Sequence, residues 1–358
     1  MTANKIIRVL IVDDSALTRN ILREILSSDD NIEVVGTAMD PYIARTKIKQ
    51  LNPDVLTLDV EMPKMNGINF LKNLMRLRPM PVVMVSSLTQ KGADVALEAL
   101  GLGAVDYVGK PDVTSETSLV DYSEEIISKI KMAASINYVP DSSARTLVTK
   151  TTPLNRAPSK TSFKSNNNQA VVVIGASTGG TEAIKEIITR LQPDSYSVIV
   201  VQHIPSAFST AFAERINRIS ALEVCEAKDN QKILSGHVYI APGDQHLKIV
   251  RDGNSCSYHC KLDDGEPVNR HKPSVDVLFK SACMSAGNNA IGILLTGMGS
   301  DGALGLKEIH DTGAITIAQD EQSSVVWGMP GEAIKLQAAD FILPLNKIAD
   351  KVTTLMKK

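Results

Sequence analysis

Short apolar runs alternate with amphipathic segments from the first residues of the chain onward. Within the first 125 residues we predict five β-strands, at 6–12, 32–36, 55–58, 81–87 and 104–109. The segments that separate them, among them 15–26 and 41–51, place apolar residues at helical spacing. Because strand and helix alternate, the pattern predicts a parallel, doubly wound α/β sheet of the flavodoxin-like type.

The same alternation returns near residue 169. Apolar runs predict buried strands at 171–174, 198–202, 290–296, 314–319 and 341–344. The segments 236–240, 245–250 and 255–261, with a turn at Asp252-Gly253-Asn254, predict an antiparallel hairpin. We therefore expect a second, Rossmann-like domain of three layers, with a mostly parallel sheet and an added hairpin.

The stretch between these two halves differs in composition. Residues 118–133 are predicted to form a helix that closes the first domain. Residues 140–168 are rich in Ser, Thr, Pro, Lys and Asn, which is typical of a flexible linker. We therefore divide the chain into a first domain at 1–125, a closing helix and linker at 126–168, and a second domain at 169–358.

Overall composition narrows the classes of function. The chain has 358 residues, of which 43% are hydrophobic and 22% charged, as expected of a soluble protein with two domains. A net charge of −2 provides no general attraction to nucleic acid or to an anionic membrane. Because no apolar run is long enough to cross a bilayer and no signal peptide is recognisable, we expect a cytoplasmic protein without direct membrane insertion.

The four cysteines are expected to be reduced thiols. Cys256, Cys260 and Cys283 could be considered as metal ligands together with His259. Their spacing matches none of the usual zinc patterns, so we expect no zinc site.

Polar side chains follow the predicted strands of the first domain. Asp13 and Asp14 follow the first strand, Asp59 the third, Ser86 ends the fourth, and Lys110 follows the fifth. The carboxyl ends of parallel strands share one edge of a sheet, where ligands bind. Three carboxylates at this edge form an oxygen-rich site suited to Mg²⁺, and Asp59 could attack phosphorus as a nucleophile. Lys110 would supply positive charge and Ser86 a hydroxyl for the new phosphoryl group.

A second set of polar residues follows three predicted strands of the second domain. The apolar strand before Ser177 stops in a glycine turn that leads into a helix, which leaves this serine at the strand end. His203 and Asp301 also follow strand ends. If these strands are neighbours, the three side chains form a nucleophile, a base and an orienting carboxylate, and the N–H groups of Thr178 and Met298 offer an oxyanion hole.

Each of these residues also has a simpler interpretation. Ser177 could cap the following helix, His203 could be structural, and Asp301 could be a helix cap. Their joint placement favours catalysis, although the chain order Ser, His, Asp differs from that of the α/β-hydrolases. His271 is a further polar candidate, as a substrate contact or as scaffold.

A dinucleotide-binding enzyme is the main competing interpretation. Gly297-x-Gly299-x-x-Gly302 matches a dinucleotide fingerprint, and Asp320 follows at about the expected distance. However, Asp301 would place a carboxylate where the pyrophosphate must lie, and too little chain follows for the rest of that fold. We favour the hydrolase and keep an NAD-dependent oxidoreductase as the alternative.

Residues 1 to about 125 resemble a response-regulator receiver domain. The likeness is carried by Asp13-Asp14, Asp59 followed by Met62-Pro63, Gly67, Ser86 and Lys110-Pro111. The resemblance implies that Asp59 accepts a phosphoryl group from a histidine kinase. It also implies that Asp14, Asp59 and the carbonyl oxygen of Glu61 hold Mg²⁺ with help from Asp13. The aromatic switch position of the family would be Tyr107.

The second domain resembles the catalytic domain of the chemotaxis protein-glutamate methylesterases. The matching segments are 175–180, 202–205, 271–276, 295–302 and 328–330. The resemblance implies that Ser177, His203 and Asp301 hydrolyse glutamate methyl esters on the cytoplasmic domains of chemoreceptors, without a cofactor, and that the same site deamidates receptor glutamines. It further implies that the receiver covers this site until Asp59 is phosphorylated. A regulator that binds a partner without catalysis remains an alternative, whereas a DNA-binding output lacks a basic recognition helix.

Overall fold

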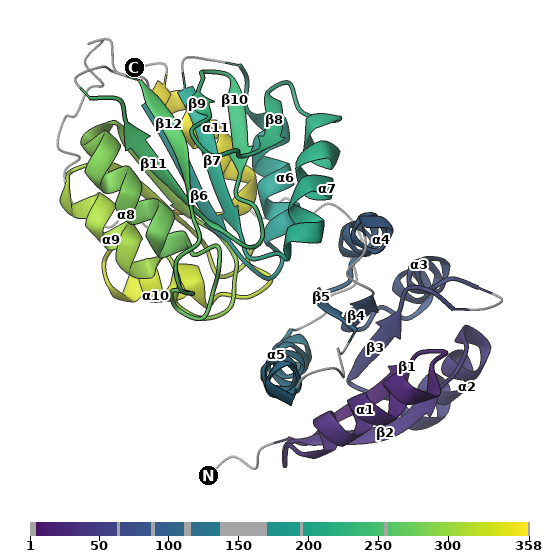
Figure 1. Ribbon diagram of the computed structural model, residues 1–358. Helices are drawn as coiled ribbons and strands as arrows, with labels where there is room; N and C mark the ends of the chain where they lie inside the picture. Colours follow the sequence, from purple (N-terminus) through teal and green to yellow (C-terminus); the bar gives the residue numbers. More distant parts are fainter. Residues whose placement is uncertain are drawn as a thin grey trace. The chain divides into compact units, whose positions relative to one another are not determined.

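The computed structural model describes residues 5–62, 65–86, 90–110, 116–136, 170–193, 196–253 and 257–356. The chain divides into two compact units, Met1–Thr146 and Leu147–Lys358. Each unit is built around its own parallel main sheet (Figure 1). The α/β fold class predicted from the sequence is therefore confirmed for both halves.

In the described residues of the first unit, the sheet has five parallel strands in the order β2-β1-β3-β4-β5. They are β1 (Ile7–Val12), β2 (Ile32–Ala38), β3 (Val55–Asp59), β4 (Val82–Ser86) and β5 (Asp106–Gly109). The helices are α1 (Ala16–Ser27), α2 (Pro41–Leu51), α3 (Gly67–Leu77), α4 (Gln90–Gly101) and α5 (Glu116–Ser135). Because the strand order reverses between β1 and β3, the polar residues at their carboxyl ends meet at one place.

Local sequence explains where the first two helices begin. Ser15 caps α1 by accepting the N–H of Thr18, and Asp40 caps α2 by accepting the N–H of Ile43. Pro41 occupies the first position of α2, where the missing N–H removes no helical hydrogen bond. These caps direct each helix away from the strand end that precedes it.

Helix α5 belongs to the first unit over its whole length. It packs against α1 and against β3, β4 and β5, and its Ile126 and Ile130 lie in the core. The domain limit predicted at residue 125 therefore falls inside this helix. Residues 140–168, which are predicted to form the linker, lie outside the described residues.

In the described part of the second unit, the main sheet has seven parallel strands in the order β15-β14-β13-β6-β7-β10-β8. They are β6 (Ala170–Ala176), β7 (Tyr196–Gln202), β8 (Glu223–Glu226), β10 (His237–Ile240), β13 (Ala290–Leu294), β14 (Ile315–Gln319) and β15 (Phe341–Leu343). The helices are α6 (Gly180–Arg190), α7 (Ser206–Asn217), α8 (Val275–Ala286), α9 (Ala303–Asp311), α10 (Met329–Lys335) and α11 (Leu345–Met356). Since β7 is added on one side of β6 and β13 on the other, the strand order reverses at β6.

A smaller antiparallel sheet accompanies the main one. It consists of β9 (Lys232–Ile233), β11 (His246–Arg251) and β12 (Tyr258–Asp263) in the order β11-β12-β9. The predicted hairpin is therefore present as β11 and β12. Segment 236–240, which the sequence pattern places in the hairpin, instead forms β10 between β7 and β8, because its run of buried residues suits a strand covered on both faces.

Helices cover both faces of the second main sheet, with α8, α9 and α10 on one side and α6 and α7 on the other (Figure 1). Helix α8 contacts both β6 and β11, so it lies between the two sheets. Gly175 allows this close approach, since a Cβ atom there would lie 2.1 Å from Cγ1 of Val275 at the start of α8. Within the described ranges, no helix has both the length and the apolar character that a bilayer crossing requires.

Candidate active site

Ser177 follows the last residue of β6 and stands before a glycine turn. Gly179, with φ of 76°, is the N-cap of α6, so the serine hydroxyl does not cap that helix. A side chain at Gly179 would also collide with Val325, since its Cβ would lie 2.6 Å from that residue. The turn therefore requires glycine on both conformational and steric grounds, and it leaves Ser177 half-buried at the sheet edge.

The two strands beside β6 bring further groups to Ser177. Ala176 is paired with Gln202, so Ser177 and His203 are the next residues at the same level, and the His203 N–H donates to the Ala176 carbonyl at 3.2 Å. On the other side the Ser177 N–H donates to the carbonyl of Thr296 at 3.0 Å. In the described residues no hydrogen bond joins the Ser177 hydroxyl to the His203 ring. Such bonds often tighten only when substrate is bound.

His203 and Asp301 form a buried pair. His203 Nε2 lies 2.8 Å from Asp301 Oδ2, and the two side chains are 8% and 1% exposed. An ionised carboxylate only accepts hydrogen bonds, so Nε2 carries the proton and the lone pair of the neutral ring is on Nδ1. His203 Nδ1 is buried and has no hydrogen-bond partner among the described residues. The nitrogen that can act as a base is therefore Nδ1.

Asp301 is held ionised by its surroundings. Burial opposes the charge, but the hydrogen bond from His203 and those from Asn269 and the Val275 N–H outweigh it and lower the pKa of Asp301. Oδ1 accepts Asn269 Nδ2 and Ser274 Oγ, both at 2.8 Å, and Oδ2 accepts the Val275 N–H at 2.7 Å. Asp301 thus binds the first turn of α8, whereas α9, the helix that follows it in sequence, has Gly302 as N-cap.

Asn269 and Ser274, which both donate to Asp301, were not identified from the sequence as residues of this site. Asn269 and Arg270, with φ of 53° and 66°, form a two-residue hairpin turn closed by hydrogen bonds between Val268 and His271. Asn is typical of such turns, which is a usable local signal. No local signal indicates that its amide reaches Asp301, nor that Ser274 does. The same turn places the ring of His271 against His203, with ring centroids 3.7 Å apart and planes at 15°.

The predicted oxyanion donors are the N–H groups of Thr178, which follows Ser177, and of Met298, which follows Gly297. Thr178 is buried within the glycine turn, and Met298 lies on the loop after β13. Gly297 packs directly on the serine, because a Cβ there would lie 2.8 Å from Ser177 Cβ. The N–H groups of Thr178 and Met298 therefore belong to the two loops that border the serine.

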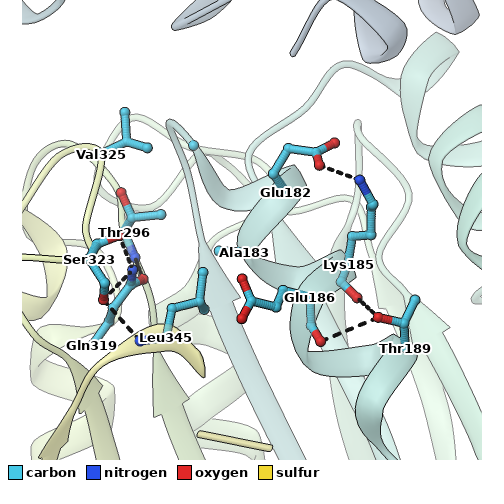
Figure 2. A pocket seen from close by; sticks show the side chains of 11 residues that line it. Glu182, Ala183, Lys185, Glu186, Thr189, Thr296, Gln319, Ser323, Val325 and Leu345 are labelled. Atoms are coloured by element: carbon cyan, nitrogen blue, oxygen red, sulfur yellow. Dashed lines mark hydrogen bonds and ion pairs between the residues drawn. The ribbon is translucent and has the colours of Figure 1, made fainter. Parts of the chain in front are cut away.

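A cavity of about 370 Å³ lies beside the glycine turn (Figure 2). Its walls come from α6, from the loop around Ser323 and from Leu345. Figure 2 shows the ion pair of Glu182 and Lys185 on the α6 wall and the polar group of Gln319 and Ser323 opposite. Ser177, His203 and Asp301 do not line this cavity, so we do not assign the reaction to it.

The first unit gathers its charged residues at the ends of β1, β3 and β5. Lys110 Nζ lies 2.9 Å from Asp59 Oδ2 and 3.4 Å from Asp13 Oδ2. Burial raises the pKa of Asp59 to about 6, and the charge of Asp13 adds to this effect while Lys110 opposes it. Burial also raises the pKa of Asp13. Two neighbouring carboxylates repel each other when both are ionised, and a nearby positive charge stabilises that state.

The carboxylates fit a hard divalent cation. Asp13, Asp14 and Asp59 each offer an oxygen within 4.8 Å of the others, an all-oxygen set of the kind Mg²⁺ prefers. The Glu61 N–H donates to Asp59 at 3.2 Å, which holds the Glu61 backbone beside the cluster.

The two other residues predicted to take part in the phosphorylation response, Ser86 and Tyr107, lie on the strands β4 and β5. Ser86 is buried at the end of β4, and its carbonyl accepts the N–H of Lys110 at 2.8 Å. Tyr107 is buried in β5, and Lys129 Nζ lies 5.3 Å from its ring centroid. Burial raises the pKa of Tyr107 well above its ordinary value. Ser86 thus lies at a strand end, whereas Tyr107 lies within its strand.

Comparisons with known proteins cover both units. The family model for CheB methylesterase matches residues 172–352, and that for the response regulator receiver domain matches residues 9–120. A protein-glutamate methylesterase/protein-glutamine glutaminase of Hydrogenovibrio crunogenus is 54% identical over 98% of this chain and 99% of its own. Protein-glutamate methylesterase/protein-glutamine glutaminase 2 of Xanthomonas oryzae pv. oryzae is also 54% identical, over 99% of each chain. The crystal structure of the Thermotoga maritima CheB methylesterase catalytic domain is 37% identical with a TM-score of 0.50, over 52% of this chain and 99% of that one.

Proposed function

The chain belongs to the CheB methylesterase family and carries a response regulator receiver domain, and we propose that it is a phosphorylation-activated protein-glutamate methylesterase of a chemotaxis system. Its substrates are glutamate methyl esters on the cytoplasmic domains of chemoreceptors. The same site deamidates receptor glutamines, the activity that its relatives carry in their names. The protein acts in the cytoplasm, and its ester chemistry uses no cofactor.

The first half of the reaction transfers the acyl group to the enzyme. Ser177 Oγ attacks the ester carbonyl carbon while His203 Nδ1 takes the hydroxyl proton. Asp301 holds the ring in the tautomer that leaves Nδ1 unprotonated and stabilises the imidazolium that forms. When the bond from the carbonyl carbon to the methoxy oxygen breaks, His203 returns the proton and methanol leaves.

The second half regenerates the serine. Water enters the place of methanol, gives a proton to His203 and attacks the acyl carbon, which releases the glutamate carboxylic acid and the Ser177 hydroxyl. For a glutamine substrate the leaving group is ammonia in place of methanol, and the other steps are the same. In both halves the N–H groups of Thr178 and Met298 bind the negative oxygen of the tetrahedral intermediate.

One observation carries this proposal. The buried bond of 2.8 Å between His203 and Asp301 leaves the unpartnered Nδ1 on the histidine that is level with Ser177. A histidine with only a structural role would be expected to use both ring nitrogens when buried, since an unpaired buried polar atom is costly.

Phosphorylation is assigned to the first unit. A histidine kinase supplies the phosphoryl group, and Asp59 accepts it. Asp13, Asp14, Asp59 and the Glu61 carbonyl would hold Mg²⁺, which neutralises charge on the phosphoryl group when bound. Lys110 and Ser86 bind the phosphoryl group on Asp59, and Tyr107 is the residue that responds to phosphorylation. Phosphorylation shifts the population towards a form with higher esterase activity.

Methanol release from methylated receptor tests the proposal. The wild type is expected to release methanol, whereas Ser177→Ala should lose at least about 1,000-fold in kcat because no nucleophile remains. Ser285→Ala is the control, since this serine lies at the far end of α8 and only donates to the carbonyl of Ile249. Full activity of Ser177→Ala would exclude the proposed nucleophile, and absence of methanol with the wild type would exclude the activity.

A further inference from the structure

Gln202, the last residue of β7, places its amide between the backbones of Ser177 and His203. The side chain is 3% exposed. Its Nε2 donates to the Ser177 carbonyl at 2.9 Å and, at 3.4 Å, to the carbonyl of His203. One buried amide therefore contacts the main chain of both the proposed nucleophile and the proposed base.

The bond to Ser177 acts on the peptide that carries an oxyanion donor. The Ser177 carbonyl and the Thr178 N–H belong to the same planar trans peptide, so they point in opposite directions. A donor that fixes the carbonyl also fixes the direction of the N–H. The Gly180 N–H binds the same carbonyl at 2.7 Å, so the peptide is held by two donors. Hydrogen bonding to the carbonyl also polarises the peptide and makes its N–H a stronger donor.

The space for this amide is built into the glycine turn. A Cβ atom on Gly180 would lie 2.1 Å from Gln202 Oε1, so only glycine leaves room for it. Oε1 itself is buried and has no hydrogen-bond partner in the described residues. Rotating the amide by half a turn would direct its oxygen at the two carbonyl oxygens, which repel it. The observed orientation therefore keeps the donor on Ser177 although the acceptor remains unsatisfied, a feature that a purely structural amide would be expected to avoid.

We propose that Gln202 is a positioning residue for the reaction, which orients the Ser177–Thr178 peptide so that the Thr178 N–H points at the developing oxyanion. This inference rests on the proposed esterase function. It predicts an effect on the transition state rather than on substrate binding, because the amide contacts the enzyme backbone and not the substrate.

The first test compares two buried glutamines in the full-length protein. Gln202→Met removes the donor at nearly constant volume, and kcat for methanol release should fall roughly 10-fold to 100-fold with KM changed less than about 3-fold, a loss in the range seen for a weakened oxyanion donor. Gln319→Met is the matched control. Gln319 ends the strand β14, is also buried, and accepts the Thr296 N–H at 2.8 Å, but it does not bind the Ser177–Thr178 peptide. Its kcat should stay within about 3-fold of wild type, a margin far smaller than the loss of an oxyanion donor.

The second test uses a readout that a loss of structure would not produce. In Gln202→Glu the protonated carboxyl can still donate to the Ser177 carbonyl, whereas the ionised carboxylate repels it. This variant should therefore show a descending limb in kcat as the pH rises, which the wild type lacks. The neighbouring titratable groups, His203 and Asp301, are also present in the wild type and in Gln319→Met, which should lack this limb.

The outcomes separate the two proposals. If the wild type releases methanol but Gln202→Met keeps its kcat, or loses it only through KM, the positioning role is wrong and the esterase stands. The role is also wrong if Gln319→Met loses as much kcat, or if Gln202→Glu has the pH profile of the wild type. If the wild type releases no methanol, the esterase proposal itself has failed.

Discussion

Two aspartates that are equally buried have pKa values shifted in opposite directions. Asp59 and Asp301 are each 1% exposed, yet the pKa of Asp59 is raised to about 6 and that of Asp301 is lowered. Burial disfavours the charge in both, but Asp301 accepts hydrogen bonds on both oxygens, including two from backbone N–H groups of α8. Among the described residues, Lys110 is the cation that pairs with Asp59, and it also lies near Asp13. Asp301 is thus held as an anion beside the imidazole of His203, whereas the ionisation of Asp59 is favoured by added positive charge.

This difference predicts a pH-dependent stability for the first unit. The unfolded pKa of an aspartate is about 3.9, so between about pH 4 and pH 6 the folded state binds more protons than the unfolded one. Stability contributed by Asp59 is therefore lost as the pH rises through this range. Without Mg²⁺, Asp59→Asn should raise the free energy of unfolding by about 1–3 kcal/mol at pH 7–8, and by little below pH 4.

Thermal or urea unfolding of the wild type and Asp59→Asn at several pH values measures this effect. Asp30→Asn, at an exposed position of the same unit, is the control. A stabilisation that does not depend on pH, or one that also appears in the control, would contradict the proposed cause.

Among the elements of the second unit, the loops that follow β6 and β13 position Ser177, Asp301 and the residues around them. Gly297 lies on the loop after β13. Its N–H donates to the Val326 carbonyl, and the residue packs against Ser177. The pattern Gly297-x-Gly299-x-x-Gly302 looks like a dinucleotide fingerprint, but the structure explains its glycines without a ligand: Gly297 by its close packing, and Gly299 by its φ of 78°. Gly302 has φ of 84°, and a Cβ atom there would lie 2.5 Å from Val275.

Gly297→Ala should therefore impair catalysis more than folding. The new methyl group would lie 2.8 Å from Ser177 Cβ and 2.3 Å from Met329 Sδ, so the β13 loop must move away from the serine. We expect kcat to fall at least about 10-fold, because small displacements of reacting groups are costly in rate. Methanol release measures this loss. Gly265→Ala, where the new methyl would meet only ordinary contacts beyond 3.4 Å, should keep its activity, and an unaffected Gly297→Ala would exclude this packing role.

At the scale of the whole molecule, the chain has two α/β units with separate sheets. The proposed function assigns phosphorylation to the first unit and ester hydrolysis to the second. Each unit places its polar residues where its own strand order reverses, between β1 and β3 in the first and beside β6 in the second. The proposed function requires that a charge change at Asp59 alters the activity at Ser177. Such a change can act only by shifting a population between two arrangements of the molecule.

A small phosphodonor should therefore stimulate methanol release by the wild type, and Asp59→Asn should stay at its basal rate. The basal rate itself should be retained, because Asp59 is not part of the ester-cleaving group. Asp30→Asn should respond as the wild type does. Normal stimulation of Asp59→Asn would place the phospho-acceptor at another residue.

The elements were largely predictable because their signals are local. The helix at 41–51 has the predicted bounds, and Ser177, His203 and Asp301 follow the strands β6, β7 and β13 as expected. β10 was assigned to the hairpin, since nothing near 236–240 states which strand will pair with it. The roles of Asn269, Ser274 and Gln202 were not foreseen for the same reason: each depends on a partner supplied by a distant part of the chain.

The sequence alone therefore determined the periodic elements, the glycine turns and the chemical groups at the strand ends, because spacing, backbone freedom and side-chain chemistry are properties of neighbouring residues. The tertiary structure decided which strand ends are adjacent, which nitrogen of His203 faces Asp301, and why two buried aspartates differ in pKa. Those properties depend on strand order and on hydrogen bonds between residues far apart in the chain, such as Ser274 with Asp301 and Gln202 with Ser177, and only folding brings these groups together.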